Sequence, residues 1–525
     1  MTDRHSHREA TAAIIDGRLD AAGDLLDALL ARDPGDAYAH MLLAKLAAAR
    51  RDPAGEWAMM AKAVALDPGN GDYWAMLARC HARAQDLAGA LDCAAEAQAR
   101  APLGDVALAA LASTFTHFGR HDEAAAVLRQ AVAAGSRNPA IQFNLGNNLK
   151  FLGDFAGARD AFEAALALAP DYARARAALS ALGDARGDPE DLQRITAALA
   201  ATPDPRARIH LCHAAAHEYE AAGRPDDAWR VLDEGKAALR GAIRYDPAAV
   251  LNGIAAISSR ASAREAPAFQ SAPVQPNSPI FVVGMPRSGT TVMDRIVSNH
   301  PDVTSIGESL QFAQQLKLAA GSRSPLLLDD AVGVALSDTA LLHEVGLRFG
   351  EHCREMVGAQ VRALDKLHLN FMLAGHIMRA RPDARILCMI RDPLDTIVSN
   401  FRQLFAFDTP LYHYSLELEA AAQMQLAFLA MVRMWTALAP GQFLTIGYES
   451  LVADPQAEAR RIFAFCGLGW DPAYIRIEEN RASVATASAV QVRQPIHANT
   501  VGSWRRYERH LAPAIAILKV GGALP

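Results

Sequence analysis

The sequence predicts a helical repeat domain followed by a three-layer α/β domain with a mostly parallel sheet. Three observations predict this: a 34-residue spacing early in the chain, a segment rich in Ser, Ala and Pro, and a strand, glycine turn and helix directly after it. At 525 residues the chain exceeds what one hydrophobic core usually supports. We expect a helical domain at 5–260, a linker at 261–278 and an α/β domain at 279–525.

The repeats are defined by positions that recur at intervals of 34 residues or multiples of 34. This period, with small residues where paired helices meet, is typical of tetratricopeptide repeats. The recurring positions are a proline (Pro34, Pro68, Pro102, Pro170), a turn glycine (Gly17, Gly119, Gly153) and a small helical residue (Ala44, Ala78, Ala112, Gly146). The segment from Phe143 to Tyr172 is the clearest copy, and helices are expected to continue to about Arg260.

Stacked helix pairs form a curved array with a concave groove, and such grooves usually bind peptides or proteins. We therefore expect a protein or peptide partner. The alternative is that the array only supports or dimerises the second domain, and the sequence does not fix the oligomeric state.

Composition excludes several other classes of protein. A net charge of -6 and a pI near 6.3 give no basic surface for nucleic acid. The chain has no long apolar stretch and starts with a polar segment, so we expect a cytoplasmic protein without membrane insertion. The cysteines are scattered and predict neither a metal site nor disulfides (Cys80, Cys93, Cys212, Cys353, Cys388, Cys466).

The α/β domain opens with a phosphate-binding pattern. Residues 279–284, PIFVVG, suit a buried strand, and MPRSGTT leads into the helical pattern VMDRIVSNH. Backbone N–H groups of Ser288 to Thr291 would face an anion at the helix start. The turn is P-loop-like but not a Walker A loop, because Thr290 follows Gly289 where that loop has lysine. This disfavours a nucleotide hydrolase or kinase.

A second motif, RILCMIRDPLDTIVSNF at 385–401, reads as a strand followed by a helix that is capped by Asp392 and begins at Pro393. Arg391 lies at the strand end and Ser399 two turns into the helix, so both can reach one phosphate. Alternatively, Arg391 only pairs with Asp395 and Ser399 is an ordinary helix-face serine.

The segment FVVGMPRSGTTVMDRIVSNHPDVTSIGES, 281–309, resembles the opening of sulfotransferases that use 3′-phosphoadenosine 5′-phosphosulfate (PAPS). The likeness is greatest to the protein-tyrosine sulfotransferase branch and its bacterial relatives with tetratricopeptide repeats, and it extends over about 279–507. It implies a sulfuryl transfer from PAPS, as co-substrate, to an acceptor hydroxyl, with no metal. A protein or peptide tyrosine is favoured as acceptor, while carbohydrate, lipid and small phenolic acceptors stay open.

The resemblance also assigns residues. It implies that the phosphosulfate binds at the glycine turn, the 3′-phosphate at the second motif, and that two later residues contact the cofactor (Arg287, Ser288, Gly289, Thr290, Thr291; Arg391, Ser399; Tyr448, Ser488). Glu308 matches the base, and Lys366 matches a catalytic cation that acts with Arg287 on the leaving oxygen. His368 is a rival base, and Arg505 or Arg506 could replace a lysine of the tyrosine-sulfating branch.

Two other hypotheses remain. A nucleotide kinase would need ATP and a divalent metal, and a scaffold would keep the repeats beside an inactive transferase domain.

Overall fold

The computed structural model describes residues 2–184, 187–261, 269, 271–322, 332, 338–407, 410–486 and 488–524. The chain forms two compact units, Met1–Tyr172 and Ala173–Pro525. Part of the expected linker, 262–268 and 270, lies outside the described residues, whereas 271–278 runs without helix or strand.

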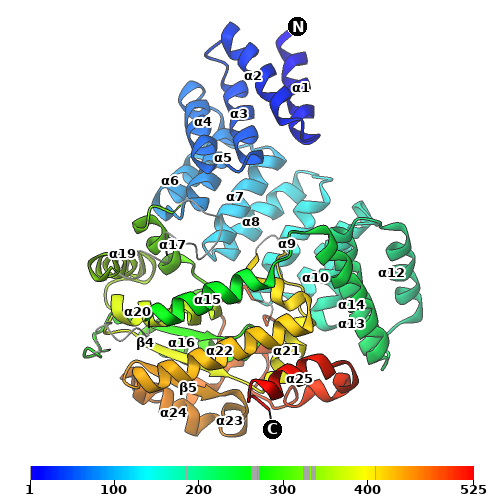
Figure 1. Ribbon diagram of the computed structural model, residues 1–525. Coiled ribbons are helices and arrows are strands. Elements are labelled where there is room, and N and C mark those ends of the chain that lie inside the picture. Colours follow the sequence, from blue (N-terminus) through cyan, green and yellow to red (C-terminus); the bar gives the residue numbers. More distant parts are fainter. Residues whose placement is uncertain are drawn as a thin grey trace. The chain divides into compact units, whose positions relative to one another are not determined.

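The first unit is an array of helix pairs, coloured blue to cyan in Figure 1. The first helices of successive pairs begin at residues 37, 71, 105 and 139, and the second helices at 53, 87, 121 and 155, so both sets repeat every 34 residues as predicted. The helices are α1 (Thr2–Ile15), α2 (Leu19–Arg32), α3 (Ala37–Ala49), α4 (Pro53–Leu66), α5 (Gly71–Arg83), α6 (Leu87–Gln98), α7 (Asp105–His117), α8 (His121–Ala133), α9 (Pro139–Leu152) and α10 (Phe155–Leu168).

The turn inside each pair has one left-handed residue. Three of these are the predicted glycines, Gly17, Gly119 and Gly153, with φ of 74°, 70° and 87°. Arg51 and Gln85 occupy the same register and adopt φ of 60° and 62°. Helix packing therefore imposes a conformation that non-glycine residues adopt only at a cost.

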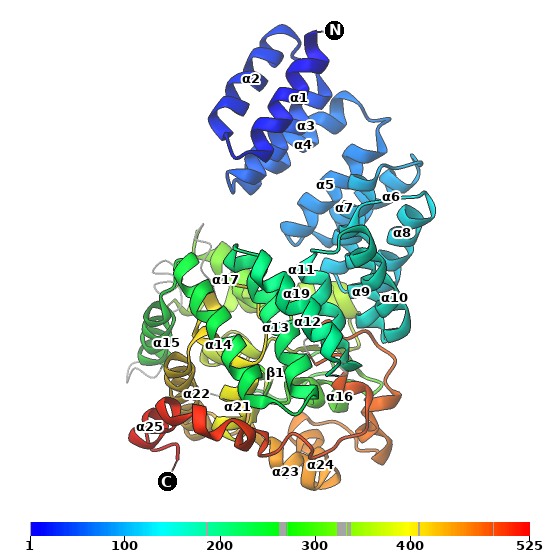
Figure 2. The ribbon, with the colours of Figure 1, turned by 90° about the vertical axis from the view of Figure 1, so that its right-hand side faces the viewer.

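Among the described residues, the second unit has five α-helices before the sheet. Figure 2 shows α13 (Pro205–Ala221) beside α14 (Pro225–Ala242), and residues 222–224 join the two helices. The others are α11 (Ala173–Leu179), α12 (Pro189–Ala201) and α15 (Pro247–Ala261), and a short π-helix, η1, spans Ser180–Asp184. Helices assigned from sequence to one domain thus divide between two units, because α13 and α14 share a hydrophobic core with the sheet.

The sheet has five parallel strands in the order β2-β3-β1-β4-β5. The strands are β1 (Ile280–Gly284), β2 (Val303–Gly307), β3 (Arg362–Asp365), β4 (Arg385–Ile390) and β5 (Phe443–Gly447). The chain moves outward from β1 to β2, returns through β3 and then crosses to β4. Strand β1 is therefore the switch point, where open α/β sheets bind ligands at the carboxyl ends of their strands.

Helices cover both faces of the sheet and make three layers, as predicted. Successive β1 residues alternate between two cores, with Phe281 and Val283 in one and Ile280 and Val282 in the other. The first core is covered mainly by α19 (Thr339–Val357), α20 (Ala374–Ala380), α21 (Pro393–Phe401) and α22 (Leu418–Leu438), and the second by α16 (Thr290–Ser298), α23 (Tyr448–Ala453) and α24 (Pro455–Cys466).

The remaining elements are short. Two further helices are α17 (Gln311–Ala319) and α25 (Ala512–Val520), and the 3-10 helices are η2 (His368–Leu373), η3 (Pro410–Leu416), η4 (Pro472–Ile475), η5 (Ile477–Glu479), η6 (Gln491–Arg493) and η7 (Ser503–His510).

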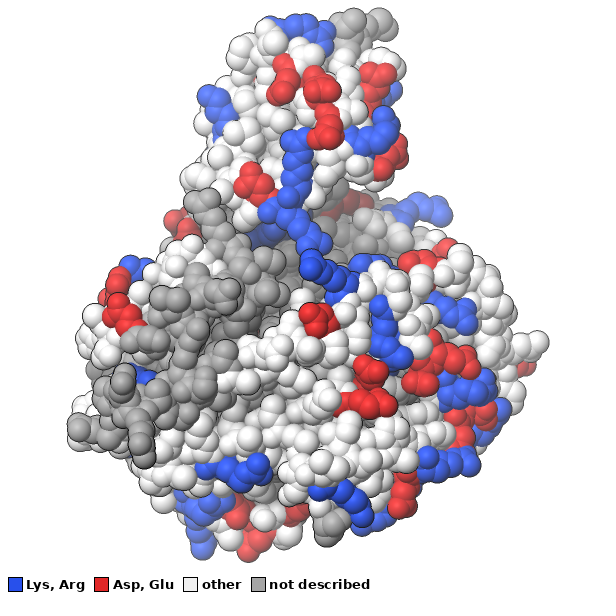
Figure 3. All heavy atoms as spheres, in the orientation of Figure 1, with Lys and Arg blue, Asp and Glu red and all other residues white. Residues whose placement is uncertain are grey.

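Surface charge is mixed over the α/β unit on the face drawn in Figure 3, where Lys and Arg side chains alternate with Asp and Glu. An anion site on this face must therefore be local. Among the described helices, none is long and apolar enough to cross a membrane.

The left-handed turns give a prediction about the repeats. Arg51→Gly should stabilise the first unit by about 1 kcal/mol, because glycine adopts the left-handed conformation without a Cβ clash. The matched control is Gly119→Ala, which should destabilise the first unit by a similar amount. The cost comes from the left-handed backbone alone, because nothing lies within 4 Å of the position that an alanine Cβ would occupy. Calorimetric unfolding of the full chain measures the stability of both variants. A change of the same sign in the two variants would contradict the explanation.

Candidate functional site

Residues singled out from the sequence lie at the carboxyl ends of all five strands. Glu308 follows β2, Lys366 follows β3, Arg391 follows β4 and Tyr448 follows β5, each directly after the last strand residue. Arg287 lies three residues beyond β1. Because the strands are parallel, these ends share one edge of the sheet, and four separate sequence motifs meet there.

The glycine turn after β1 has an unusual backbone. Arg287 is left-handed, with φ of 65°, and Gly289 has φ of 106°. A Cβ on Gly289 would lie 2.4 Å from the Tyr448 ring, so only glycine fits. The Ser288 hydroxyl is buried and has no hydrogen-bond partner among the described residues. Strained backbone and an unpartnered hydroxyl at the start of α16 are features of an anion-binding turn.

The Arg287 side chain contacts two other predicted positions, Ser399 and Ser488. Its Nε donates to Ser399 Oγ at 3.3 Å and its Nη1 to Ser488 Oγ at 2.6 Å. Gln491 accepts a third hydrogen bond at 3.0 Å. Burial, together with the positive charges of Arg402 and Arg391, lowers the pKa of Arg287 to about 10. A bound anion would relieve this repulsion.

Arg391 connects the second motif to the turn. It donates to the Arg287 carbonyl at 3.1 Å and to the Thr500 carbonyl at 2.6 Å. Its guanidinium lies 4.7 Å from the centre of the Tyr448 ring, and the Tyr448 hydroxyl is 3.1 Å from Thr500 Oγ1. The two predicted anion-binding motifs are therefore in direct contact.

Asp395 is paired mainly with the C-terminal segment rather than with Arg391. Its carboxylate is fully buried and accepts bonds from the Gly502 N–H at 2.6 Å, Ser503 Oγ at 3.0 Å and the Trp504 N–H at 2.9 Å. The nearest Arg391 nitrogen is 3.8 Å away. Asp395 therefore anchors the first turn of η7 next to the site.

The local prediction for α21 is confirmed. Asp392 caps the helix by accepting the N–H groups of Leu394 and Asp395, both at 2.9 Å, and Pro393 is its first residue. Asn400, which the sequence analysis did not single out, donates to the Pro286 carbonyl at 2.7 Å and fixes the glycine turn. Its only signal in the sequence is its place next to Ser399.

Glu308 and Lys366 form an ion pair. Lys366 Nζ, whose side chain is only 2% exposed, donates to Glu308 Oε1 at 2.6 Å, and the Glu308 side chain is 33% exposed. Burial alone would raise the pKa of Glu308, but Lys366 and His368 outweigh it and lower that pKa. Glu308 is therefore an ionised, accessible base beside a buried cation.

His368 lies beside this pair, with Nδ1 3.8 Å from Glu308 Oε1. Burial lowers the pKa of His368 to about 4, so the imidazole is neutral near pH 7. Its Nε2 is 3.2 Å from the Tyr412 hydroxyl. A neutral imidazole can also accept a proton, so His368 is still the alternative candidate for the base.

Arg505 and Arg506 are both exposed. The Arg505 guanidinium lies 5.1 Å from the centre of the Trp504 ring. Their assignment from the resemblance stays a prediction. Among the described residues, no group of three or more His, Cys, Asp or Glu is arranged to hold a metal ion.

Comparison with known proteins gives the class of the two parts. Residues 279–472 match the sulfotransferase family, and residues 139–172 match the tetratricopeptide repeat. The chain thus contains a segment that matches the sulfotransferase family and, before it, a segment that matches the tetratricopeptide repeat.

Individual proteins are similar to part of the chain. A protein of unassigned function from Aquifex aeolicus is 32% identical over 46% of this chain and 32% of its own length. A protein-tyrosine sulfotransferase from Drosophila melanogaster is 25% identical over 43% of this chain and 46% of its own length. The chain thus spans a third to a half of the length of these relatives. A mouse sulfotransferase solved with PAP is 18% identical over 51% of this chain and 91% of its own, with a TM-score of 0.30.

Asp365, the last residue of β3, gives a pH prediction. Burial raises its pKa to about 8, against about 3.9 in an unfolded chain. Between these values the folded chain holds a proton that the unfolded chain lacks, so this group's contribution to stability is lost as pH rises from about 4 to 8.

Asp365→Asn should remove that contribution. Thermal unfolding measured from pH 5 to pH 8 should show the variant gaining stability relative to wild type as pH rises. A difference that is constant over this range would mean that Asp365 does not titrate there.

Proposed function

We propose that the chain is a sulfotransferase that moves a sulfuryl group from PAPS to an acceptor hydroxyl, with a protein or peptide tyrosine as the favoured acceptor. The observation that carries this is the shared edge of the sheet, where an anion-binding turn, a second arginine motif and a carboxylate–lysine pair come together. The match of 279–472 to the sulfotransferase family supports it.

The donor has two separate phosphate groups, which need two anchors. In the proposal, the phosphosulfate binds the turn from Arg287 to Thr291, through backbone N–H groups and the unpartnered Ser288 hydroxyl. Arg391 and Ser399 take the 3′-phosphate. The contact of Arg391 with the Arg287 carbonyl joins the two anchors, so binding at one orders the other.

The acceptor's reaction needs a base and a cation. Glu308 accepts the proton of the attacking hydroxyl, the new oxygen–sulfur bond forms, and the bond from sulfur to the bridging phosphate oxygen breaks. Lys366 and Arg287 stabilise the negative charge on that oxygen. Fixed cations and backbone N–H groups suffice for this charge, and no metal is required in the proposal.

Protein-tyrosine sulfotransferases among the relatives favour a tyrosine acceptor. The repeats support a protein or peptide substrate, because their grooves commonly hold peptides. A carbohydrate, lipid or small phenol as the preferred acceptor would leave the donor assignment intact. Turnover that depends on ATP and magnesium would favour the kinase hypothesis.

Donor binding is tested by calorimetric titration with adenosine 3′,5′-bisphosphate, the expected product. The wild-type chain should bind it, and Arg391→Ala should weaken binding about 10- to 100-fold, as expected for lost charge-assisted hydrogen bonds. ATP is the control ligand and should bind much more weakly. Absence of binding by folded wild-type protein would contradict the proposal and favour the scaffold hypothesis.

Catalysis is tested with Glu308→Gln and Lys366→Met in a sulfate-transfer assay with labelled PAPS and a panel of tyrosine peptides. Glu308→Gln should lower kcat by about 100-fold or more while the bisphosphate Kd stays nearly unchanged, because a general base contributes about that much. If His368→Gln abolishes turnover while Glu308→Gln does not, the imidazole is the base instead.

A further inference from the structure

The α13–α14 hairpin, Pro205–Ala242, lies outside the segment that matches the sulfotransferase family, yet it packs against the site. Its Trp229 and Leu232 belong to the same core as Phe281 and Val283 of the central strand. The hairpin also contacts two segments that border the site, 500–510 and 410–417.

The first contact is on the donor side. Glu220 at the end of α13 forms a bidentate ion pair with Arg402 and accepts a hydrogen bond from the Tyr507 hydroxyl. Arg402 directly follows α21, which carries Ser399, and its charge acts on Arg287. Glu220 therefore neutralises a partly buried arginine beside the donor site and holds η7 at the same time.

Ring stacking extends this contact. Trp229 stacks on Phe401, with ring centres 4.6 Å apart, and on His510, 5.2 Å apart. Asp226 pairs with Arg509 and His510. The segment 500–510 is thus fixed at its start by Arg391 and Asp395 and at its end by the hairpin.

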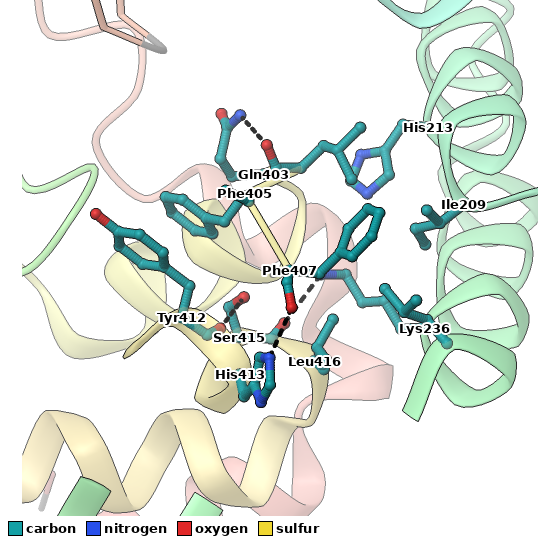
Figure 4. Close-up of a pocket in the computed structure, with 13 residues that line it drawn as sticks. Ile209, His213, Lys236, Gln403, Phe405, Phe407, Tyr412, His413, Ser415 and Leu416 are labelled. Carbon is teal, nitrogen blue, oxygen red and sulfur yellow. Dashed lines mark hydrogen bonds between the residues drawn. The ribbon is translucent and has the colours of Figure 1, made fainter. Parts of the chain in front are cut away.

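The second contact is on the acceptor side, shown in Figure 4, where Lys236 reaches from α14 toward Ser415 beside a narrow pocket. Lys236 is 1% exposed and donates to the Ser415 carbonyl at 2.9 Å. Arg240 donates to the Leu416 carbonyl at 2.5 Å. These bonds hold the segment from which Tyr412 reaches His368, next to Glu308.

We propose that the α13–α14 hairpin is a working part of the transferase site, with Glu220 and Lys236 as positioning residues for its two sides. Glu220 acts through Tyr507 and Arg402 to hold 500–510 and the donor anchors in place. Lys236 acts through Ser415 to hold Tyr412 and the acceptor side. This inference rests on the proposed function, and it adds that the domain defined by the family match needs helices from outside that match.

The test separates the two sides in the full-length protein. Tyr507→Phe removes only the hydroxyl that donates a hydrogen bond to Glu220. Lys236→Met keeps the length of the buried side chain and removes its N–H donors. Glu234→Gln is the control, because Glu234 lies on α14, the helix that carries Lys236, and its side chain is 57% exposed. Each variant is titrated with adenosine 3′,5′-bisphosphate, and amide hydrogen exchange is followed in 410–417 and 499–510.

Tyr507→Phe should raise the bisphosphate Kd about 10-fold and speed exchange in 499–510, with little change in 410–417. Lys236→Met should speed exchange in 410–417 and leave the bisphosphate Kd within about twofold. Glu234→Gln should change neither.

If both variants lose thermal stability but keep the wild-type Kd and show no local difference in exchange, the hairpin only supports the fold and the inference is overturned. If the wild-type chain binds no bisphosphate, the proposed function fails first and the inference falls with it. If wild type binds the bisphosphate but Tyr507→Phe and Lys236→Met have the same effects on Kd and on local exchange, only the inference is overturned.

Discussion

The site depends on the parallel pairing around β1. Gly284 pairs with Met389 of β4, Gly307 with Asp365 of β3, and Ile390 with Gly447 of β5, so the strands of these three pairs end within a residue of each other. Strand β1 continues past its last pair with β3, Phe281 with Asp365. Parallel strands all point the same way, and the residue that follows each one is delivered to a common edge. A single antiparallel strand would send its motif to the opposite edge, where it could not take part.

Positive charge at that edge is concentrated and only partly balanced. Arg391 and Arg402 lie close enough for their charges to act on Arg287. Two carboxylates, the buried Asp395 and the partly buried Glu220, face this group, but each is also bound to the C-terminal segment. In the proposed function the arginines bind an external anion, and the carboxylates link these arginines to the position of η7.

Local signals in the sequence predicted much of this arrangement. The 34-residue period set the helix starts of the array, and the Asp-Pro pair set the start of α21, because both depend on neighbours in the chain. The roles implied for Glu308, Lys366 and the donor contacts are still predictions, although the structure brings them to one edge.

Contacts made across the fold could not be predicted in the same way. Ser399 hydrogen-bonds the Arg287 side chain 112 residues away, and Asp395 caps η7 more than 100 residues later. No periodicity records such pairs. The packing of α13 and α14 on the sheet was missed because the loss of the 34-residue period says where repeats stop and not what replaces them.

The regular spacing of the first unit has a consequence for how this chain can vary. From α3 onward, each helix pair begins 34 residues after the previous one, and every pair turns through the same left-handed position, even where the residue is Arg51 or Gln85. Deletion or duplication of one 34-residue segment would therefore rejoin equivalent helices and preserve the stacking between neighbours. The array can change length in whole modules, so its surface can be enlarged or shortened while the sequence of the sheet and its edge stays the same.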